Sequence, residues 1–263
     1  MFDVRRSGES NCLMLRPILT QRTFIVCSYK RTPRQPRVKD EGGSVPQLAG
    51  QVMALSAIAR EASIDLQLAT QGTKFRTILA DPPWQFQNRT GKIAPEHHRL
   101  TRYPTMDLAD ICALPVQSCA AETAHLYMWV PNALLPDGLK VMEAWGFTYK
   151  SNLVWHKVRK DGGSDGRGVG FYFRNVTEIL LFGTRGKNAR TEPPGRSQVN
   201  MIQTRKREHS RKPDEQYGLI ESCSPGPYLE LFARGNRSNW LVWGNQAGES
   251  YQPDWPTYRN AAS

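Results

Sequence analysis

The chain has 263 residues, a length that suits one domain with a substantial core plus extensions, or two small domains. Its formal net charge of +11 favours an anionic partner such as nucleic acid. No apolar run is long enough to span a bilayer and no signal-peptide core is visible, so no membrane association is expected. The expected location is cytoplasmic, nucleoid-associated in a prokaryote or nuclear in a eukaryote.

Metal and disulfide chemistry find little support in the sequence. The five cysteines are odd in number and scattered, which is typical of reduced thiols rather than of a disulfide framework or a zinc module. His97 and His98 are adjacent, so on a regular element their side chains would point apart. We expect them to make loop contacts and predict no metal site.

Residues 1–72 are expected to form a basic N-terminal extension that is partly disordered and contains one helix. The run from Thr32 to Pro46 is rich in proline, glycine and serine, a composition typical of a linker. From Pro46 to Ile64 the apolar residues recur at helical spacing, which predicts the helix.

The stretch from Thr77 to Trp84, TILADPPW, is the first with a chemical signature. Its apolar residues predict a buried strand, which Pro82 and Pro83 stop abruptly because neither can donate to a sheet ladder. Asp81 would then lie at a strand tip on a stiff turn, and ligands of α/β sheets bind at such carboxyl ends. An ordinary Asp-Pro turn is the simpler interpretation. The indole that follows favours a flat substrate with an amine, such as a nucleobase.

After a long polar stretch, residues 85–106, which is typical of a binding loop, the elements begin to alternate. We predict a short helix at 107–114, a strand at 124–130, a helix at 133–145 and strands at 151–157 and 178–183. This alternation is typical of a parallel sheet covered by helices.

Two segments combine positive charge with little apolar periodicity. Residues 157–174 are rich in glycine and charge and include Phe171 and Tyr172, and residues 184–212 carry nine Lys/Arg against Glu192 and Glu208. A solvent-exposed surface with no binding role explains such a charge run equally well. The alternative is a clamp for nucleic acid.

The last part of the domain is the most regular. Lys212 and Pro213 are predicted to open a helix that runs through Ile220, and buried strands are predicted at 228–233 and 240–244. Residues 251–263 are expected to form a C-terminal tail.

Three segments, ILADPPW at 78–84, KPDEQYGLIE at 212–221 and YLELFAR…NWLVWGNQ from 228 to 246, together resemble the METTL-type methyltransferases. That family methylates the exocyclic amine of adenine in RNA or DNA with S-adenosyl-L-methionine. The resemblance implies a catalytic domain at 73–250 with an α/β fold, a Rossmann-like methyltransferase sheet flanked by helices. DPPW precedes the cofactor-site segments, which is a circularly permuted motif order. It also explains why no GxGxxG opens the chain.

The resemblance also implies the site residues. The catalytic group would be Asp81, Pro82, Pro83 and Trp84. Substrate contacts would come from Tyr103, Asp65 and Arg207. Cofactor contacts would come from Asp81, Lys212, Glu230, Arg234, Asn236, Asn245 and Gln246.

These residue types suit methyl transfer to an amine. The adenine amine is a weak nucleophile because its lone pair is conjugated with the ring. Hydrogen bonds from its two protons to the Asp81 carboxylate and the Pro82 carbonyl would return electron density to nitrogen and orient it. In a duplex the base must first be flipped out, and Trp84 or Tyr103 could stack on it.

The sequence leaves alternatives open. DNA is favoured over RNA as the substrate, because no partner-docking module is visible. The chain could also be an RNA adenosine methyltransferase, or an inactive nucleic-acid-binding subunit that keeps the fold. Pairing as a homodimer or a heterodimer is compatible with the sequence.

Overall fold

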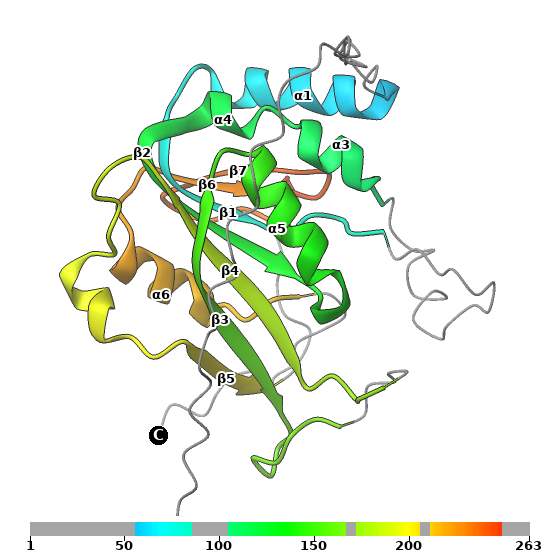
Figure 1. Cartoon of the computed structure of the whole chain (residues 1–263), viewed down its shortest axis with the longest axis vertical. Coiled ribbons are helices and arrows are strands. Elements are labelled where there is room, and N and C mark those ends of the chain that lie inside the picture. The colour runs from blue at the N-terminus through cyan, green and yellow to red at the C-terminus, as the bar shows by residue number, and fades with distance from the viewer. Residues whose placement is uncertain (1–55, 86–104, 167–171, 206–210, 249–263) are drawn as a thin grey trace, which may run out of the picture. The chain divides into compact units, whose positions relative to one another are not determined.

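The computed structural model describes residues 56–85, 105–166, 172–205 and 211–248. These residues form a seven-stranded sheet in the order β5-β3-β4-β2-β1-β6-β7, with helices packed on both faces (Figure 1). The predicted α/β sheet flanked by helices is therefore confirmed. Within the described ranges, no helix is both long and apolar enough to cross a membrane.

The described elements are named here in chain order. The helices are α1 (Ala57–Thr70), α3 (Leu108–Ala113), α4 (Val116–Cys119), α5 (Leu135–Ala144) and α6 (Glu215–Cys223), with 3-10 turns η1 (Asn132–Leu134) and η2 (Pro193–Ser197). The strands are β1 (Phe75–Ala80), β2 (Ala120–Val130), β3 (Thr148–Val158), β4 (Thr177–Arg185), β5 (Met201–Arg205), β6 (Tyr228–Leu231) and β7 (Trp240–Trp243).

Strand β1 lies where the chain changes sides of the sheet. It pairs in parallel with β2 on one side and, after a long excursion of the chain, with β6 on the other. Only β4 departs from the predicted parallel arrangement, because it runs antiparallel to both β2 and β3. The carboxyl ends of β1, β2 and β6 therefore share one edge, and a switch point of this kind is where α/β sheets bind ligands.

Alternating residues of the strands build a core on each face. Ile78 and Ala80 pack in a cluster with residues of α1, α3 and α5, whereas Leu79 packs on the opposite face with Ile220 of α6. Because side chains of a strand alternate between faces, the uninterrupted apolar run of β1 means that helices cover both sides.

Helix α1 differs from its prediction at its carboxyl end. It continues beyond Ile64 to Thr70, and the expected start at Pro46 lies outside the described residues. Ser56 caps its first turn and donates a hydrogen bond to Asp110 of α3. Gln71 and Gly72 then end it in left-handed conformation. Leu66 is buried, so the helix packs on the core.

Strand β5 lies in the charged segment for which the sequence predicts no strand. Ile202 and Thr204 are buried whereas Met201 and Gln203 are exposed, so a period of two is present but short. Helix α6 also begins later than predicted, at Glu215, and Asp214 pairs with Arg211 instead of capping the first turn. Lys212 therefore precedes the helix.

Helix α5 lies so close to β2 that only glycine fits at position 138. A Cβ there would meet Cγ2 of Val130 at 2.6 Å and Cδ1 of Leu181 at 3.2 Å. Gly138→Ala is expected to lower the free energy of unfolding by about 1–3 kcal/mol, the usual cost of overpacking. Urea unfolding measures this.

Gly218 provides the matched control, because it lies in helix α6 at a position where a Cβ would meet no atom within 4 Å. Gly218→Ala is expected to be neutral or to stabilise by up to about 1 kcal/mol through helix propensity. Equal effects of the two substitutions would contradict the close packing of α5 on β2.

Candidate active site

The turn after β1 is held by several hydrogen bonds. The Trp84 backbone N–H donates to the Pro82 carbonyl at 2.8 Å, and the Met106 N–H donates to the Pro83 carbonyl at 3.0 Å. The Trp84 indole N–H donates to the backbone carbonyl of Trp129 at the end of β2, at 2.9 Å. The turn is therefore fixed before any ligand binds, and Asp81 is presented from a rigid support.

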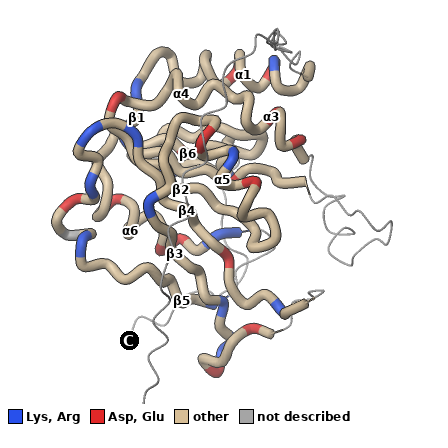
Figure 2. Tube along the Cα trace, in the orientation of Figure 1, with Lys and Arg blue, Asp and Glu red and all other residues tan. Residues whose placement is uncertain are grey.

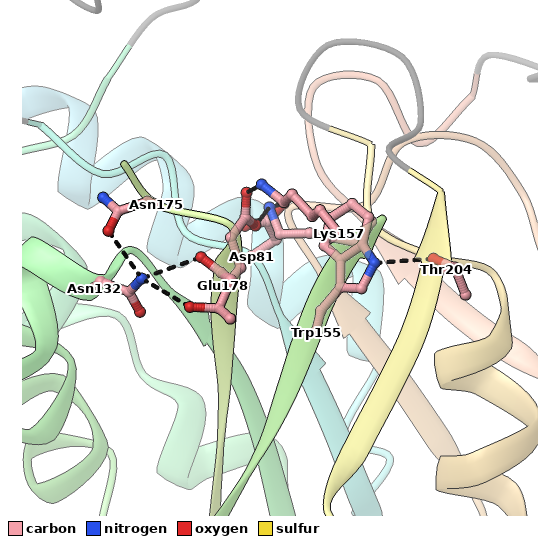
Figure 3. A network of polar contacts seen from close by, with 9 residues as sticks. Asp81, Asn132, Trp155, Lys157, Asn175, Glu178 and Thr204 are labelled. Atoms are coloured by element: carbon pink, nitrogen blue, oxygen red, sulfur yellow. Dashed lines mark hydrogen bonds and ion pairs between the residues drawn. The ribbon is translucent and has the colours of Figure 1, made fainter. Parts of the chain in front are cut away.

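Asp81 belongs to a chain of alternating charges at this edge. Lys212 Nζ lies 3.0 Å from Asp81 Oδ2 and 3.4 Å from Glu178 Oε2, and Lys157 pairs with the other oxygen of Glu178. The side chains of Asp81, Glu178 and Lys157 come from three different elements and meet at one place (Figure 3). Because each charge has a neighbour of opposite sign, the cluster tolerates partial burial.

These neighbours decide the protonation states. Burial alone would lower the pKa of Lys212, but the carboxylates of Asp81 and Glu178 outweigh it and raise that pKa above its ordinary value. Burial likewise opposes ionisation of Glu178, yet Lys212 and Lys157 hold its pKa below the ordinary value. Lys212 and Glu178 are therefore both charged at neutral pH.

Two indole rings support the lysines. The Lys212 ammonium lies 5.5 Å from the ring centre of Trp129, and that of Lys157 lies 4.8 Å from the ring centre of Trp155. The Trp129 indole N–H donates to Gln216. The Trp155 indole N–H donates to the Thr204 hydroxyl (Figure 3). Both tryptophans are buried in the core, so core residues also position charge.

Glu230 of β6 lies on the same face as α6. It is level with Leu79 of β1, and the Tyr217 hydroxyl donates to both of its carboxylate oxygens at 3.0 Å. Burial raises the pKa of Glu230 to about 7; the nearby charge of Asp81 adds to the shift and the Tyr217 hydrogen bond opposes it. A carboxylate of this kind is well placed to meet a positively charged ligand group.

The carboxyl ends of β6 and β7 form the neighbouring wall. Gly244 has a φ of 154°, and a Cβ there would meet the backbone N of Ala233 at 2.7 Å, so glycine lets the two strand ends approach. Arg234 and Gln246 form a parallel bridge in which the Gly235 N–H donates to the Gln246 carbonyl at 2.9 Å. Asn236 and Asn245 are exposed beside this bridge.

The structure thus brings together several of the predicted residues near the carboxyl ends of β1 and β6: Asp81, Pro82, Pro83, Lys212 and Glu230. Arg234 is close enough for its charge to lower the pKa of Lys212, against the larger effect of the carboxylates. Asp65 instead accepts a hydrogen bond from the Trp243 indole at 2.7 Å, which ties α1 to β7. Tyr103 and Arg207 lie outside the described residues.

Trp84 departs from the expected stacking geometry. Its indole is only 7% exposed and packs in the core, and its N–H donates to the Trp129 carbonyl. In this conformation it supports the turn and offers no open ring face to a base. Base stacking by Tyr103 stays a prediction.

Sequence reasoning missed Glu178, Lys157 and Tyr217. Glu178 lies near the start of β4 and Lys157 near the end of β3. A charged residue at the end of each predicted strand is the sequence signal that could have identified them. Their meeting could not be foreseen without the antiparallel pairing of β3 with β4.

Glu178→Gln tests the charge chain. The variant leaves Lys157 and Lys212 facing a neutral amide, so the free energy of unfolding at pH 7 is expected to fall by about 1–3 kcal/mol, less than for a fully buried pair. Because the pKa of Glu178 is lowered in the folded state, its contribution is present above its unfolded pKa and disappears as the pH falls through the folded value. Urea unfolding between pH 7 and pH 4 should therefore show the two proteins converging in acid.

Asp161→Asn is the control for this comparison, since Asp161 pairs with Arg159 in an exposed loop at 2.9 Å. Little change in stability is expected for it, as for most surface pairs. If Glu178→Gln and Asp161→Asn change the free energy of unfolding equally at pH 7, the chain of alternating charges does not stabilise the fold.

Comparison with known proteins places this geometry in a family. M.MunI, a Type II methyltransferase from Mycoplasma sp, is 30% identical over 187 residues, which cover 65% of this chain and 77% of that protein. The human N(6)-adenosine-methyltransferase catalytic subunit METTL3 is 28% identical over 182 residues, or 66% of this chain. An Arabidopsis thaliana N(6)-adenosine-methyltransferase MT-A70-like protein is 29% identical over 176 residues, or 65%.

The chain spans only 28% of the human protein and 24% of the plant one. A family model described as MT-A70 matches residues 75–246, which contain every described strand and the charge chain at the carboxyl edge. The resemblance inferred from the three motifs is confirmed: the chain belongs to the MT-A70 family.

Proposed function

We propose that this chain is an S-adenosylmethionine-dependent methyltransferase that acts on the exocyclic amine of adenine in nucleic acid, with DNA favoured over RNA. The observation that carries the proposal is the placement of the Asp81 carboxylate on a rigid turn at the switch point, held by Lys212 at 3.0 Å. Membership of the MT-A70 family supports the reaction type.

The turn offers acceptors for both protons of the amine. The Pro82 carbonyl already accepts from the Trp84 N–H, which fixes its direction, and a carbonyl oxygen can accept a second hydrogen bond. Asp81 supplies a negatively charged acceptor beside it. Two hydrogen bonds from the amine would orient its lone pair and raise its electron density. As the amine becomes acidic during transfer, its proton can pass to Asp81 or to water.

Lys212 has two consequences for this step. Its ammonium orients the Asp81 carboxylate by donating to Oδ2 at 3.0 Å, and it places a positive charge beside the acceptor. Glu178 shares the same ammonium, so Asp81 does not have to neutralise it alone. The carboxylate can therefore accept a proton from the substrate amine while Lys212 stays paired.

The polar groups at this edge fit S-adenosyl-L-methionine. Its amino group and sulfonium are cationic and suit Asp81 and Glu230; its carboxylate suits Lys212 and Arg234; its ribose hydroxyls suit the amides of Asn245 and Gln246. The close approach at Gly244 brings the Arg234 and Gln246 segments side by side, as such a cradle requires. When bound, the cofactor supplies the methyl group, the positive charge and the leaving group.

The preference for DNA rests on how much of each relative's length the similarity covers. The similarity to M.MunI extends over 77% of that protein, but it covers only 28% of METTL3, whose name specifies adenosine, the ribonucleoside. An RNA adenosine methyltransferase is the alternative substrate class. An inactive nucleic-acid-binding subunit is the alternative function.

Asp81→Asn is the sharpest test of the proposed mechanism. The substitution keeps the shape of the side chain but removes its charge and places a donor where the amine needs an acceptor. Turnover should fall at least about a hundredfold, as for loss of one preorganised group. The measurement is single-turnover methyl transfer at saturating cofactor, with melting temperatures matched.

Asp137→Asn makes the same chemical change on α5, where Asp137 pairs with Lys140 at 3.2 Å. It should leave transfer unaltered. Near-normal transfer by Asp81→Asn would remove Asp81 from the mechanism, and absence of transfer by the unaltered protein with cofactor bound would favour the inactive subunit.

Asn245 and Gln246 give a separate test of cofactor placement. Replacing both with Ala should weaken S-adenosylmethionine binding by about 1–3 kcal/mol, the range for hydrogen bonds lost at a binding site. Calorimetry measures the affinity, and circular dichroism should show an unchanged fold. Wild-type affinity of the double variant would mean that the ribose binds elsewhere.

A further inference from the structure

A groove lies at the amino edge of the sheet, opposite the candidate active site. Its volume is about 630 Å³, and its lining includes Lys150 at the start of β3, Arg185 at the end of β4, Arg190 in the following loop and Glu122 of β2. Hydroxyl and amide groups of Thr148 and Asn188 complete the polar part of the wall. The groove is therefore polar, with three cationic side chains against one carboxylate.

The positive charge extends beyond the groove itself. Figure 2 shows Lys and Arg positions gathered around the end of the sheet where β1 and β2 begin. The residues of this amino-edge cluster are Lys74, Arg76, Lys150, Arg185, Lys187 and Arg190. Five of them are exposed, and no ion pair joins any of the six to a carboxylate within the described part of the chain. Their charge is available to a ligand.

The wall of the groove is built on a fixed turn. Gly186 has a φ of 80°, and a Cβ there would meet the Glu122 carbonyl oxygen at 2.4 Å, so the loop after β4 is pressed against β2. Arg185 donates to the Gln117 carbonyl at 3.3 Å and lies over the Phe147 ring. Arg190 follows in the same loop, where its backbone N–H donates to the Asn188 carbonyl at 2.8 Å.

This edge is remote from the chemistry. Glu178 and Arg185 are seven positions apart along β4, which at the rise of a strand is about 23 Å. For the basic segment from Thr184 the sequence leaves open a solvent-exposed surface with no binding role or a clamp for nucleic acid, and the structure places its first three cations on the opposite edge from Asp81. Contacts there cannot touch the target base; they could only reach a distant part of the same molecule.

We propose that this groove binds backbone phosphates of the nucleic acid at positions remote from the target adenine, an inference that rests on the proposed function. Phosphate is the chemistry that Lys and Arg clusters recognise. The cations come from several segments and are spread along an edge, which suits a polyanion better than one small anion. Because phosphates repeat every 3.4 Å along each strand of duplex DNA, a span of about 23 Å would place the contacted phosphates about seven nucleotides from the target.

The test removes two groove cations without touching the fold. Lys150→Gln with Arg190→Gln is the variant of choice, because both residues are exposed whereas Arg185 also packs on Phe147. Binding of a 30-base-pair duplex DNA is measured against salt concentration. Losing two phosphate contacts should reduce the logarithmic salt slope by about two units, so that the wild type loses about tenfold more affinity than the variant between 50 and 200 mM salt.

Arg60→Gln with Lys140→Gln is the matched control, since it removes the same charge from exposed positions on α1 and α5. It should keep the wild-type slope. In methyl transfer to the same duplex, the groove variant should show a raised KM and an unchanged kcat. A groove variant whose slope equals that of the control would overturn the proposal.

Free phosphate as the true ligand is a separate outcome. The wild type, but not the groove variant, would then melt at a higher temperature in potassium phosphate than in potassium chloride of equal ionic strength, with identical duplex slopes, and that result also overturns the proposal. The proposed function fails independently: a reduced slope together with absence of methyl transfer by the wild type would retain the groove and reject the enzyme.

Discussion

The ammonium group of Lys212 lies between two carboxylates, and the organisation of the candidate active site depends on that contact. Asp81 comes from the turn after β1 and Glu178 from the start of β4, so one cation joins the ends of two strands to the segment before α6. Removing Lys212 would take the cation away from Asp81 and would leave Glu178 with Lys157 alone. The same contact fixes the direction of the Asp81 carboxylate at this edge of the sheet.

Topology creates this meeting point. Strand β1 lies between β2 and β6, so residues more than a hundred positions apart in the chain reach the same edge. The opposite edge collects the beginnings of the parallel strands and the end of the antiparallel β4. Because β4 runs antiparallel to its neighbours, its start, with Glu178, lies at the edge that holds Asp81 and Lys212. Its end, with Arg185, lies at the opposite, basic edge.

Much of the fold could be predicted from local pattern. The strand containing Ile78 and Leu79 is buried on both faces and reads as an unbroken apolar run, and the carboxyl half of β2 follows the same rule. Strand β5 was not predicted because its alternation of buried and exposed residues covers only five residues within a charged stretch. The reversed direction of β4 leaves no mark in composition, because either direction buries the same residues.

The site was only partly accessible to sequence reasoning. Asp81, Lys212 and Glu230 stand in recognisable motifs, whereas Glu178 and Lys157 act only through contacts that pairing of β3 with β4 creates. Trp84 illustrates the opposite error, since an aromatic beside a carboxylate suggested an open stacking surface and its indole is a core residue.

The most direct test of the proposed reaction is transfer of radiolabelled methyl from S-adenosylmethionine to matched single- and double-stranded DNA and RNA, with the labelled base identified by mass spectrometry. Adenine amino-methylation at the Asp81 turn predicts label in N6-methyladenine, with DNA the better substrate. Label on another base, or none on any of the four nucleic acids when the cofactor is bound, would contradict it.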